Sequence, residues 1–421
     1  MRRIFLLAVA GAALAAAGPS PAAEIETLLR DDALWSLSVG ELARRHGDFN
    51  WKWVESGVSA RSSDPGITFA GRRVSESLFR FENGRAARLT VFLYNRGDAG
   101  TRTEEEFDAQ VKEAAAALTA WAGPAAEPPR SLRVAANARA ETQSWRHPPH
   151  QATLEWSSSR PRGPDGRSYF RAEYIRLDLA PAEATAAAAA LHPPPAPPDR
   201  VLREPGGDVR IIEVPMVDQG PKGYCAVAVI ERVLRYYGRE FDQHQAAQIA
   251  GTGETGTASD RLADAARRIA ARFRLNFRVL YESDLAALSE DYNRRARRVK
   301  AEPITTGRTL YANSIFPRMN GALLREARLD QRADRRRFFE QIREHVDGGA
   351  PLIWSVILGF IAEQPPLPQA TGGHLRLIIG YHAERQEILY TDSWGAGHEL
   401  KRMGAEDAWT ITMGLYAILP R

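Results

Sequence analysis

The chain has 421 residues, a length that accommodates about two to three ordinary domains. Hydrophobic residues make up 44% of it and charged residues 26%, a composition that excludes a disordered or fibrous protein. The formal net charge of +4 is small for this length, so the sequence predicts no nucleic-acid partner.

The first 23 residues have the pattern of a secretory signal peptide. Arg2 and Arg3 precede an apolar run, and Pro-Ser-Pro-Ala-Ala stands before Glu24. The run is too short and too rich in alanine and glycine to cross a membrane, and no later stretch reaches the roughly 18 apolar residues that a span needs. We therefore expect an exported protein, periplasmic or extracellular, without a membrane span in the mature chain. The paired arginines leave both the general secretory route and the twin-arginine route open.

Residues 24–190 predict a small α+β domain. Alternating apolar and polar residues surround Asn83-Gly84, a strong hairpin signal, and Thr103-Glu-Glu-Glu106 is a capping box that opens an alanine-rich helix. The pattern indicates two loose copies of a helix followed by strands, with no catalytic group of residues. The predicted helices are 39–46 and 104–121, and the predicted strands are 51–54, 77–81, 87–94, 141–145, 152–157 and 169–179.

The Pro-rich segment 191–208 predicts an interdomain linker, and residues 209–421 predict a second domain. Apolar spacing indicates a helix that begins at or just before Cys225 and ends at Gly238. Helices come first along this domain and strands last, which is an α+β arrangement. The other predicted helices are 259–273 and 335–346, and the predicted strands are 351–358, 374–381, 387–391 and 414–419.

Cys225 is the single cysteine of the chain, which excludes a disulfide and a lipid-anchored cysteine. An unpaired thiol in an exported protein is a liability unless it is buried or useful. Because a helix amino terminus and a neighbouring imidazole both favour the thiolate, Cys225 is a candidate nucleophile.

Acyl transfer by a thiolate also needs a base, a group that orients the base, and donors for the oxyanion. His374 opens a predicted strand after two glycines, and Asp392 follows the return strand, where its carboxylate can hold the imidazole. Gln219 precedes Cys225 by six residues, in a loop with two glycines that can bring its amide over the thiol. We expect this amide and the backbone N–H of Cys225 to form the oxyanion hole.

These segments resemble the three catalytic segments of papain-like cysteine peptidases, in the same order. The segments are Gln219-Gly-x-x-Gly-x-Cys225, His374 with Gly380-Tyr381, and Asp392-Ser-Trp-Gly395. The resemblance implies Cys225 as nucleophile, His374 as base and acid, Asp392 as its orienting group and Gln219 as oxyanion donor. It also implies that Trp394 shields the His–Asp pair from water.

Two further segments resemble the bacteriocin-processing (double-glycine) branch, family thirty-nine of the clan. They are Val233-Leu-Arg-Tyr-Tyr-Gly238 and the stretch from Ile342 to Pro351. Asp392 stands where papain has asparagine, as is usual in this branch, whereas Lys222 and Ala226 replace a disulfide cysteine and a tryptophan of papain. Such domains are normally fused to a membrane transporter, and none is encoded here, so cleavage of a double-glycine leader does not follow.

The sequence thus predicts an exported cysteine peptidase that acts on protein or peptide, including cell-envelope substrates, through a thioester acyl-enzyme and without metal or cofactor. A transglutaminase-like acyltransferase with the same triad is an alternative, although 149 residues separate Cys225 from His374, more than is usual there. A binding protein with a vestigial site is another. The remaining histidines of this domain are interpreted as structural: His244, His345, His382 and His398.

Overall fold

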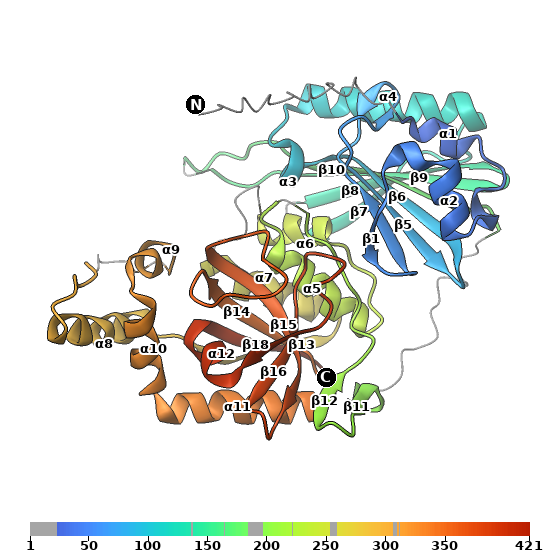
Figure 1. Cartoon of the computed structure of the whole chain (residues 1–421). Helices are drawn as coiled ribbons and strands as arrows, with labels where there is room; N and C mark the ends of the chain where they lie inside the picture. Colours follow the sequence, from blue (N-terminus) through green and yellow to red (C-terminus); the bar gives the residue numbers. More distant parts are fainter. Residues whose placement is uncertain are drawn as a thin grey trace, which may run out of the picture.

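The computed structural model describes residues 23–135, 138–163, 165–183, 197–220, 222–252, 259–305, 310 and 312–421. The predicted signal peptide, apart from its last residue, and the first part of the predicted linker lie outside these residues. The described chain contains two large antiparallel sheets, each with its own hydrophobic core (Figure 1). We call residues 23–183 the first region and residues 197–421 the second region.

The first region is built on an eight-stranded sheet of order β1-β2-β5-β6-β10-β9-β8-β7, in which every pair is antiparallel. Two helices within residues 25–45 precede β1, β2, β5 and β6 of this sheet, and two helices within residues 96–122 precede β7 to β10, so the two sets of strands meet at the β6–β10 pair. The expected order of a helix followed by strands, twice, is therefore present. The strands are β1 (Lys52–Glu55), β2 (Ser59–Ser62), β5 (Glu76–Glu82), β6 (Arg85–Asn95), β7 (Arg130–Ala135), β8 (Ala138–His147), β9 (His150–Ser159) and β10 (Arg171–Pro181), and β3 (Thr68–Phe69) pairs with β4 (Arg72–Arg73) apart from this sheet.

Local sequence explains the main elements of this region. Asn83 and Gly84 both have positive φ and join β5 to β6, as a tight hairpin requires. Thr103 and Glu106 form the expected capping box at the start of the long helix α4, which lies across β8, β9 and β10. The helices are α1 (Ile25–Leu29), α2 (Val39–Arg45), α3 (Arg96–Ala99) and α4 (Glu104–Ala122), with short 3-10 turns at Leu34–Ser36 and Gly47–Phe49.

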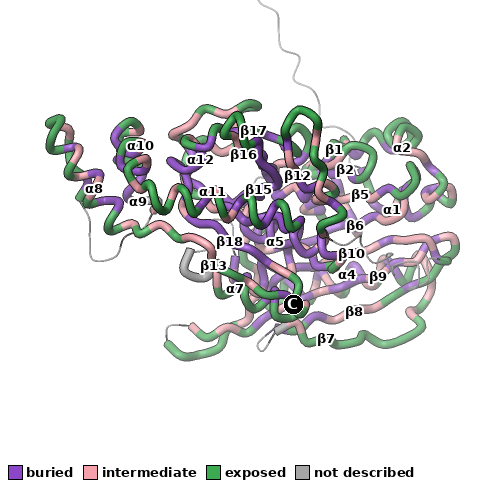
Figure 2. The backbone as a smooth tube through the Cα atoms, turned by 90° about the horizontal axis from the view of Figure 1, so that it is seen from below, coloured by how far each residue is buried: buried purple, intermediate pink, exposed green. Residues whose placement is uncertain are grey.

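The second region contains a sheet of order β11-β12-β15-β14-β18-β13, and β16 extends it by pairing with β15 and β17. All described pairs are again antiparallel. The long central strand β15 carries buried positions along most of its length (Figure 2). The strands are β11 (Val201–Arg203), β12 (Asp208–Ile211), β13 (Leu275–Glu282), β14 (Leu352–Leu358), β15 (Gly372–His382), β16 (Glu387–Thr391), β17 (Lys401–Gly404) and β18 (Thr412–Pro420).

Helix α5 is almost entirely buried and packs on β15, while α6 contacts both α5 and β10, so these helices lie between the two sheets (Figure 1). Helices α8 to α10 form a lobe at the edge farthest from the first sheet (Figures 1 and 2). The helices are α5 (Cys225–Tyr236), α6 (Gln243–Ala250), α7 (Ser259–Arg272), α8 (Leu285–Arg298), α9 (Ala312–Ile315), α10 (Gly321–Leu329), α11 (Arg332–Asp347) and α12 (Ala405–Ile411), with 3-10 turns at Pro197–Arg200 and Phe316–Arg318.

The second region differs from the expected order in two places. Strand β11 lies within the segment 191–208 that was predicted to be a linker, and it pairs with β12 at the edge of the second sheet. Arg200 is buried there and donates a hydrogen bond of 2.8 Å to the carbonyl of Tyr236, a contact that proline content alone does not reveal. Strand β13 interrupts the helices and pairs with β18, so the strands do not all come last.

The mixture of helices and antiparallel sheets confirms the α+β class. The independence of residues 24–190 as a domain stays a prediction, because charged and aromatic side chains of the two regions contact one another. Within the described part of the chain, every helix is too short or too polar to cross a membrane.

Candidate active site

Cys225 is the first residue of α5, and its thiol is half-buried. The first N–H groups of a helix have no intrahelical acceptor, so the backbone N–H of Cys225 remains available to a developing oxyanion. Burial opposes ionisation of the thiol, but interaction with His374 and the backbone N–H groups of Leu375 and Ala226 outweighs it, and the pKa of Cys225 is lowered. The thiolate is thus favoured at this position.

His374 lies near the start of β15 and is fully buried. Its Nε2 lies 3.2 Å from Oδ1 of Asp392. Its Nδ1 makes no hydrogen bond of normal geometry with a described residue, yet Cys225 is close enough to influence the ring. Burial lowers the pKa of His374, but Asp392 and the Cys225 thiol together raise it above the ordinary value. A raised histidine pKa beside a lowered cysteine pKa favours an imidazolium–thiolate pair.

Asp392 directly follows β16, and the antiparallel pairing of β15 with β16 brings it back to His374. Trp394 covers this pair: its ring stacks on the imidazole with centroids 4.1 Å apart and planes 4° from parallel. The expected hairpin of β15 and β16 therefore brings together His374, Asp392 and Trp394, which were all identified in the sequence.

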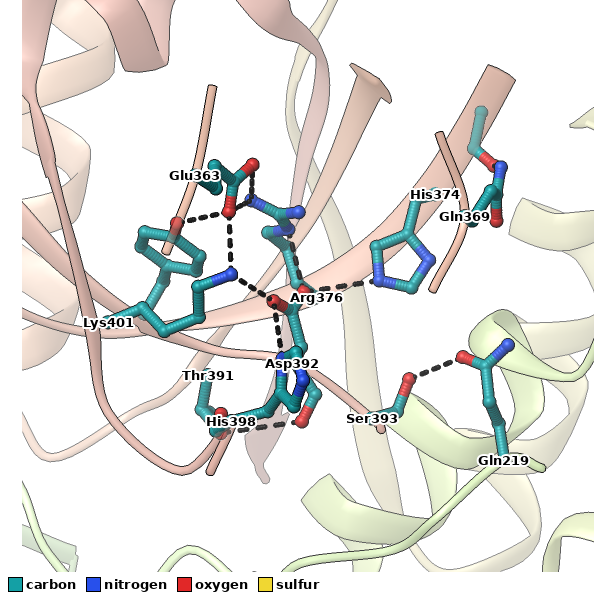
Figure 3. Close-up of polar contacts among 12 residues, drawn as sticks. Gln219, Glu363, Gln369, His374, Arg376, Thr391, Asp392, Ser393, His398 and Lys401 are labelled. Atoms are coloured by element: carbon teal, nitrogen blue, oxygen red, sulfur yellow. Dashed lines mark hydrogen bonds and ion pairs between the residues drawn. The ribbon is translucent and has the colours of Figure 1, made fainter. Parts of the chain in front are cut away.

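Gln219 is buried beside the same loop (Figure 3). Its Oε1 accepts a hydrogen bond of 2.7 Å from Oγ of Ser393, and its Nε2 donates one of 3.2 Å to the carbonyl of Lys222. Because a carbonyl oxygen can only accept, the contact with Lys222 fixes which end of the amide carries the nitrogen. An amide nitrogen carries two N–H groups, and this contact uses one of them.

The sequence patterns did not indicate a group of charged residues that surrounds Asp392, on the Nε2 side of His374. The carboxylate of Asp392 forms ion pairs with Nε of Arg376 at 2.9 Å and with Nζ of Lys401 at 3.2 Å, and Nδ1 of His398 lies 3.7 Å away (Figure 3). Arg376 and Asp392 are completely buried, and Lys401 is 4% exposed. His398, interpreted from the sequence as lying outside any site, therefore belongs to the surroundings of Asp392.

Glu363 balances the charge of these cations. It forms ion pairs with Arg376 at 3.0 Å and with Lys401 at 2.8 Å, and it accepts a hydrogen bond from the hydroxyl of Tyr390. Two carboxylates, Asp392 and Glu363, thus face the two cations Arg376 and Lys401. We call it the Asp392 cluster: Asp392, Glu363, Arg376, Lys401 and His374.

This cluster keeps Asp392 ionised. Burial by itself raises the pKa of the carboxyl, but Arg376, the hydrogen bond from His374, the nearby His398 and the charge of His374 hold it well below its usual range. One sequence signal could have revealed part of the cluster. Arg376 stands two residues after His374 on one strand, and residues two apart point to the same face of a sheet.

Among the described residues, no group of three or more His, Cys, Asp or Glu side chains is arranged to hold a metal ion. A cavity of about 530 Å³ lies between the two regions, with Glu55 and Arg80 on one side and Asp218 and Arg235 on the other. The cavity is not lined by Cys225, His374 or Asp392, so these candidate catalytic residues lie outside it.

An α+β fold that brings a helix-initial cysteine next to a buried histidine–aspartate pair is typical of papain-like cysteine peptidases. Residues 211–416 match the model of the Peptidase_C39 like family. This segment, from β12 to β18, is therefore similar to C39 peptidases, as the resemblance of the sequence motifs predicted. The family indicates a cysteine peptidase, a hydrolase that acts on protein or peptide.

One solved structure with a likeness to the chain is the peptidase domain of Streptococcus ComA, described as a bi-functional ABC transporter involved in a quorum sensing pathway. The match has 16% sequence identity and a TM-score of 0.27, and covers 50% of this chain and 100% of that domain. The search of curated proteins found no match.

Proposed function

We propose that the protein is an exported cysteine peptidase that hydrolyses peptide or isopeptide bonds through a Cys225–His374–Asp392 triad. The observation that carries this proposal is the half-buried Cys225 at the start of α5, with a lowered thiol pKa beside a histidine that a buried aspartate holds. The pattern of residues 1–23 supports export.

In the proposed reaction the Cys225 thiolate attacks the substrate carbonyl and forms a C–S bond. The backbone N–H of Cys225 and Nε2 of Gln219 stabilise the oxyanion. The amine leaves with a proton from His374, which gives a thioester. Water, deprotonated by His374, then hydrolyses the thioester and releases the carboxylic acid and the free thiol.

The test is to incubate the purified mature protein and a Cys225→Ala variant with a peptide library, and to identify the products by mass spectrometry. We expect new termini with the wild type only. Equal cleavage by the variant would refute the assignment. Products in which an added amine has replaced water would instead identify an acyltransferase, and no product at all, with an unreactive Cys225, would identify a vestigial site.

A further inference from the structure

The first region contacts the loop that carries Gln219 through buried ion pairs. Nζ of Lys222 lies 2.6 Å from Asp98 and 3.4 Å from Glu76, and the lysine side chain is only 2% exposed. On the other side of Gln219, Asp218 pairs with Arg61 at 3.1 Å. The loop is thus tied to the first region on both sides of Gln219, through Asp218 and through Lys222.

Glu76 joins these contacts into one network. It also pairs with Arg61 at 2.6 Å and lies 2.7 Å from Nε2 of His244, at the start of α6. Despite its burial, the cations Lys222 and Arg61 and the contact with His244 hold the pKa of Glu76 well below its usual range. We call this network the interface cluster: Arg61, Glu76, Asp98, Asp218, Lys222 and His244.

The loop is held by its own contacts, such as the hydrogen bond of 2.8 Å from the Gly220 N–H to Asp218, and by its fit against the first region. Gly220 has a φ of +71°, and a Cβ at that position would lie 2.4 Å from the Arg61 guanidinium, so the loop and the first region fit closely. Two glycines between Gln219 and Cys225 give the backbone conformational freedom that external contacts must remove. Tyr224 is also buried, and its ring packs against Gly97 of the first region.

The connection to the chemistry passes through the main chain of Lys222. Its carbonyl accepts the hydrogen bond from Nε2 of Gln219, and its side chain is held by Asp98 and Glu76. A displacement of Lys222 would therefore turn the Gln219 amide away from its present orientation. These contacts join Gln219, Lys222, Asp98 and Glu76 and include neither Cys225 nor His374.

We propose that the first region is a positioning element for the oxyanion hole, in which Glu76 and Asp98 act on Gln219 through Lys222. This inference rests on the proposed function and gives the first region a part in the chemical step. Lys222, Glu76 and Asp98 are positioning residues, because none of them contacts the reacting atoms.

Two probes separate this role from that of the triad. Alkylation of Cys225 by iodoacetamide forms a C–S bond with loss of iodide and creates no oxyanion, so it reports only on the thiolate. Acylation by p-nitrophenyl acetate passes through a tetrahedral oxyanion and releases p-nitrophenolate. Lys222→Met should slow acylation about 10- to 100-fold, as misplacement of a catalytic group does, and should leave alkylation within about twofold.

A double-mutant cycle in the full chain provides the decisive comparison. Gln219→Ala should slow acylation, and Lys222→Met should add little further loss in that background, because both changes remove the same donor. Glu113→Gln, which breaks an exposed ion pair with Arg72 in the first region, is the matched control and should leave both rates unchanged.

Three results would each overturn the inference. The losses of acylation rate in the cycle could be additive, acylation could be unchanged in Lys222→Met, or alkylation could slow in parallel with acylation. If Lys222→Met does not fold, Asp98→Asn replaces it, because Asp98 is more exposed than Lys222 and its loss leaves Glu76 as a partner for the lysine. Failure of the proposed function is distinct: Cys225→Ala would then acylate as fast as the wild type.

Discussion

The Asp392 cluster and the interface cluster are similar in composition and different in position. Each has a buried carboxylate, Asp392 or Glu76, that contacts two cations and a histidine. Asp392 contacts His374, the proposed base, whereas Glu76 reaches the site only through Lys222 and its loop. Buried charge can act on the protonation of a group or on its position. We therefore expect the Asp392 cluster to affect the pH dependence of Cys225 alkylation and the interface cluster to affect the rate of acylation.

The largest effect is expected when the reacting groups themselves are removed. Cys225→Ala or His374→Ala should lower peptide hydrolysis at least ~1,000-fold, because residues of a triad act as a unit. The measurement is the rate of peptide cleavage, with circular dichroism as the control for folding. Hydrolysis by either folded variant at the wild-type rate would contradict the triad.

Asp392→Asn should affect both activity and stability. An amide can still orient the imidazole, so we expect hydrolysis to fall about 10- to 100-fold, or about 1.4 to 2.8 kcal/mol. The buried cations Arg376 and Lys401 would lose a carboxylate, which should reduce the free energy of unfolding by about 3 kcal/mol. Urea unfolding and initial rates measure the two effects. A stability equal to that of the wild type would show that Glu363 alone balances both cations.

Deletion of residues 24–191 tests the independence of the two regions. The contacts across the interface are largely charged, and these groups regain water when exposed, so we expect the second region to fold and Cys225 to react with iodoacetamide. Acylation by p-nitrophenyl acetate should fall about as far as in Lys222→Met, because the same positioning contacts are lost. A truncated protein that does not fold would show that the regions share a folding unit.

The pH dependence of alkylation should distinguish the two clusters. The pKa of Cys225 is lowered, so the rate should rise with an inflection below the ordinary thiol value of about 8.5. In His374→Ala burial remains without the imidazole, so the inflection should move above that value. In Asp392→Asn the pKa of His374 should fall, because a contact that raises it is lost, and the imidazolium–thiolate pair should persist over a narrower pH range.

The smallest expected change is that of Glu76→Gln in the same experiment. Its alkylation profile should coincide with that of the wild type, because Glu76 contacts neither Cys225 nor His374. A shifted inflection would show that the interface cluster acts on the thiolate and not on Gln219 alone.

The elements with local sequence signals could be predicted from the chain alone. The capping box at Thr103, the hairpin at Asn83-Gly84 and the helix that begins at Cys225 depend on neighbouring residues, and each is present as expected. The spacing of His374 and Asp392 also sufficed, because a hairpin brings its two strands back together regardless of the rest of the fold.

The distant charges that surround these residues could not be predicted in this way, because they depend on tertiary packing. Glu363 and Lys401 come from separate segments, and Glu76 and Asp98 come from the other region of the chain. Nothing in the spacing of such residues indicates their partners, since an isolated Glu or Lys is typical of a solvated surface. They are buried here because opposite charges from different elements meet and compensate one another, which is a property of packing rather than of local sequence.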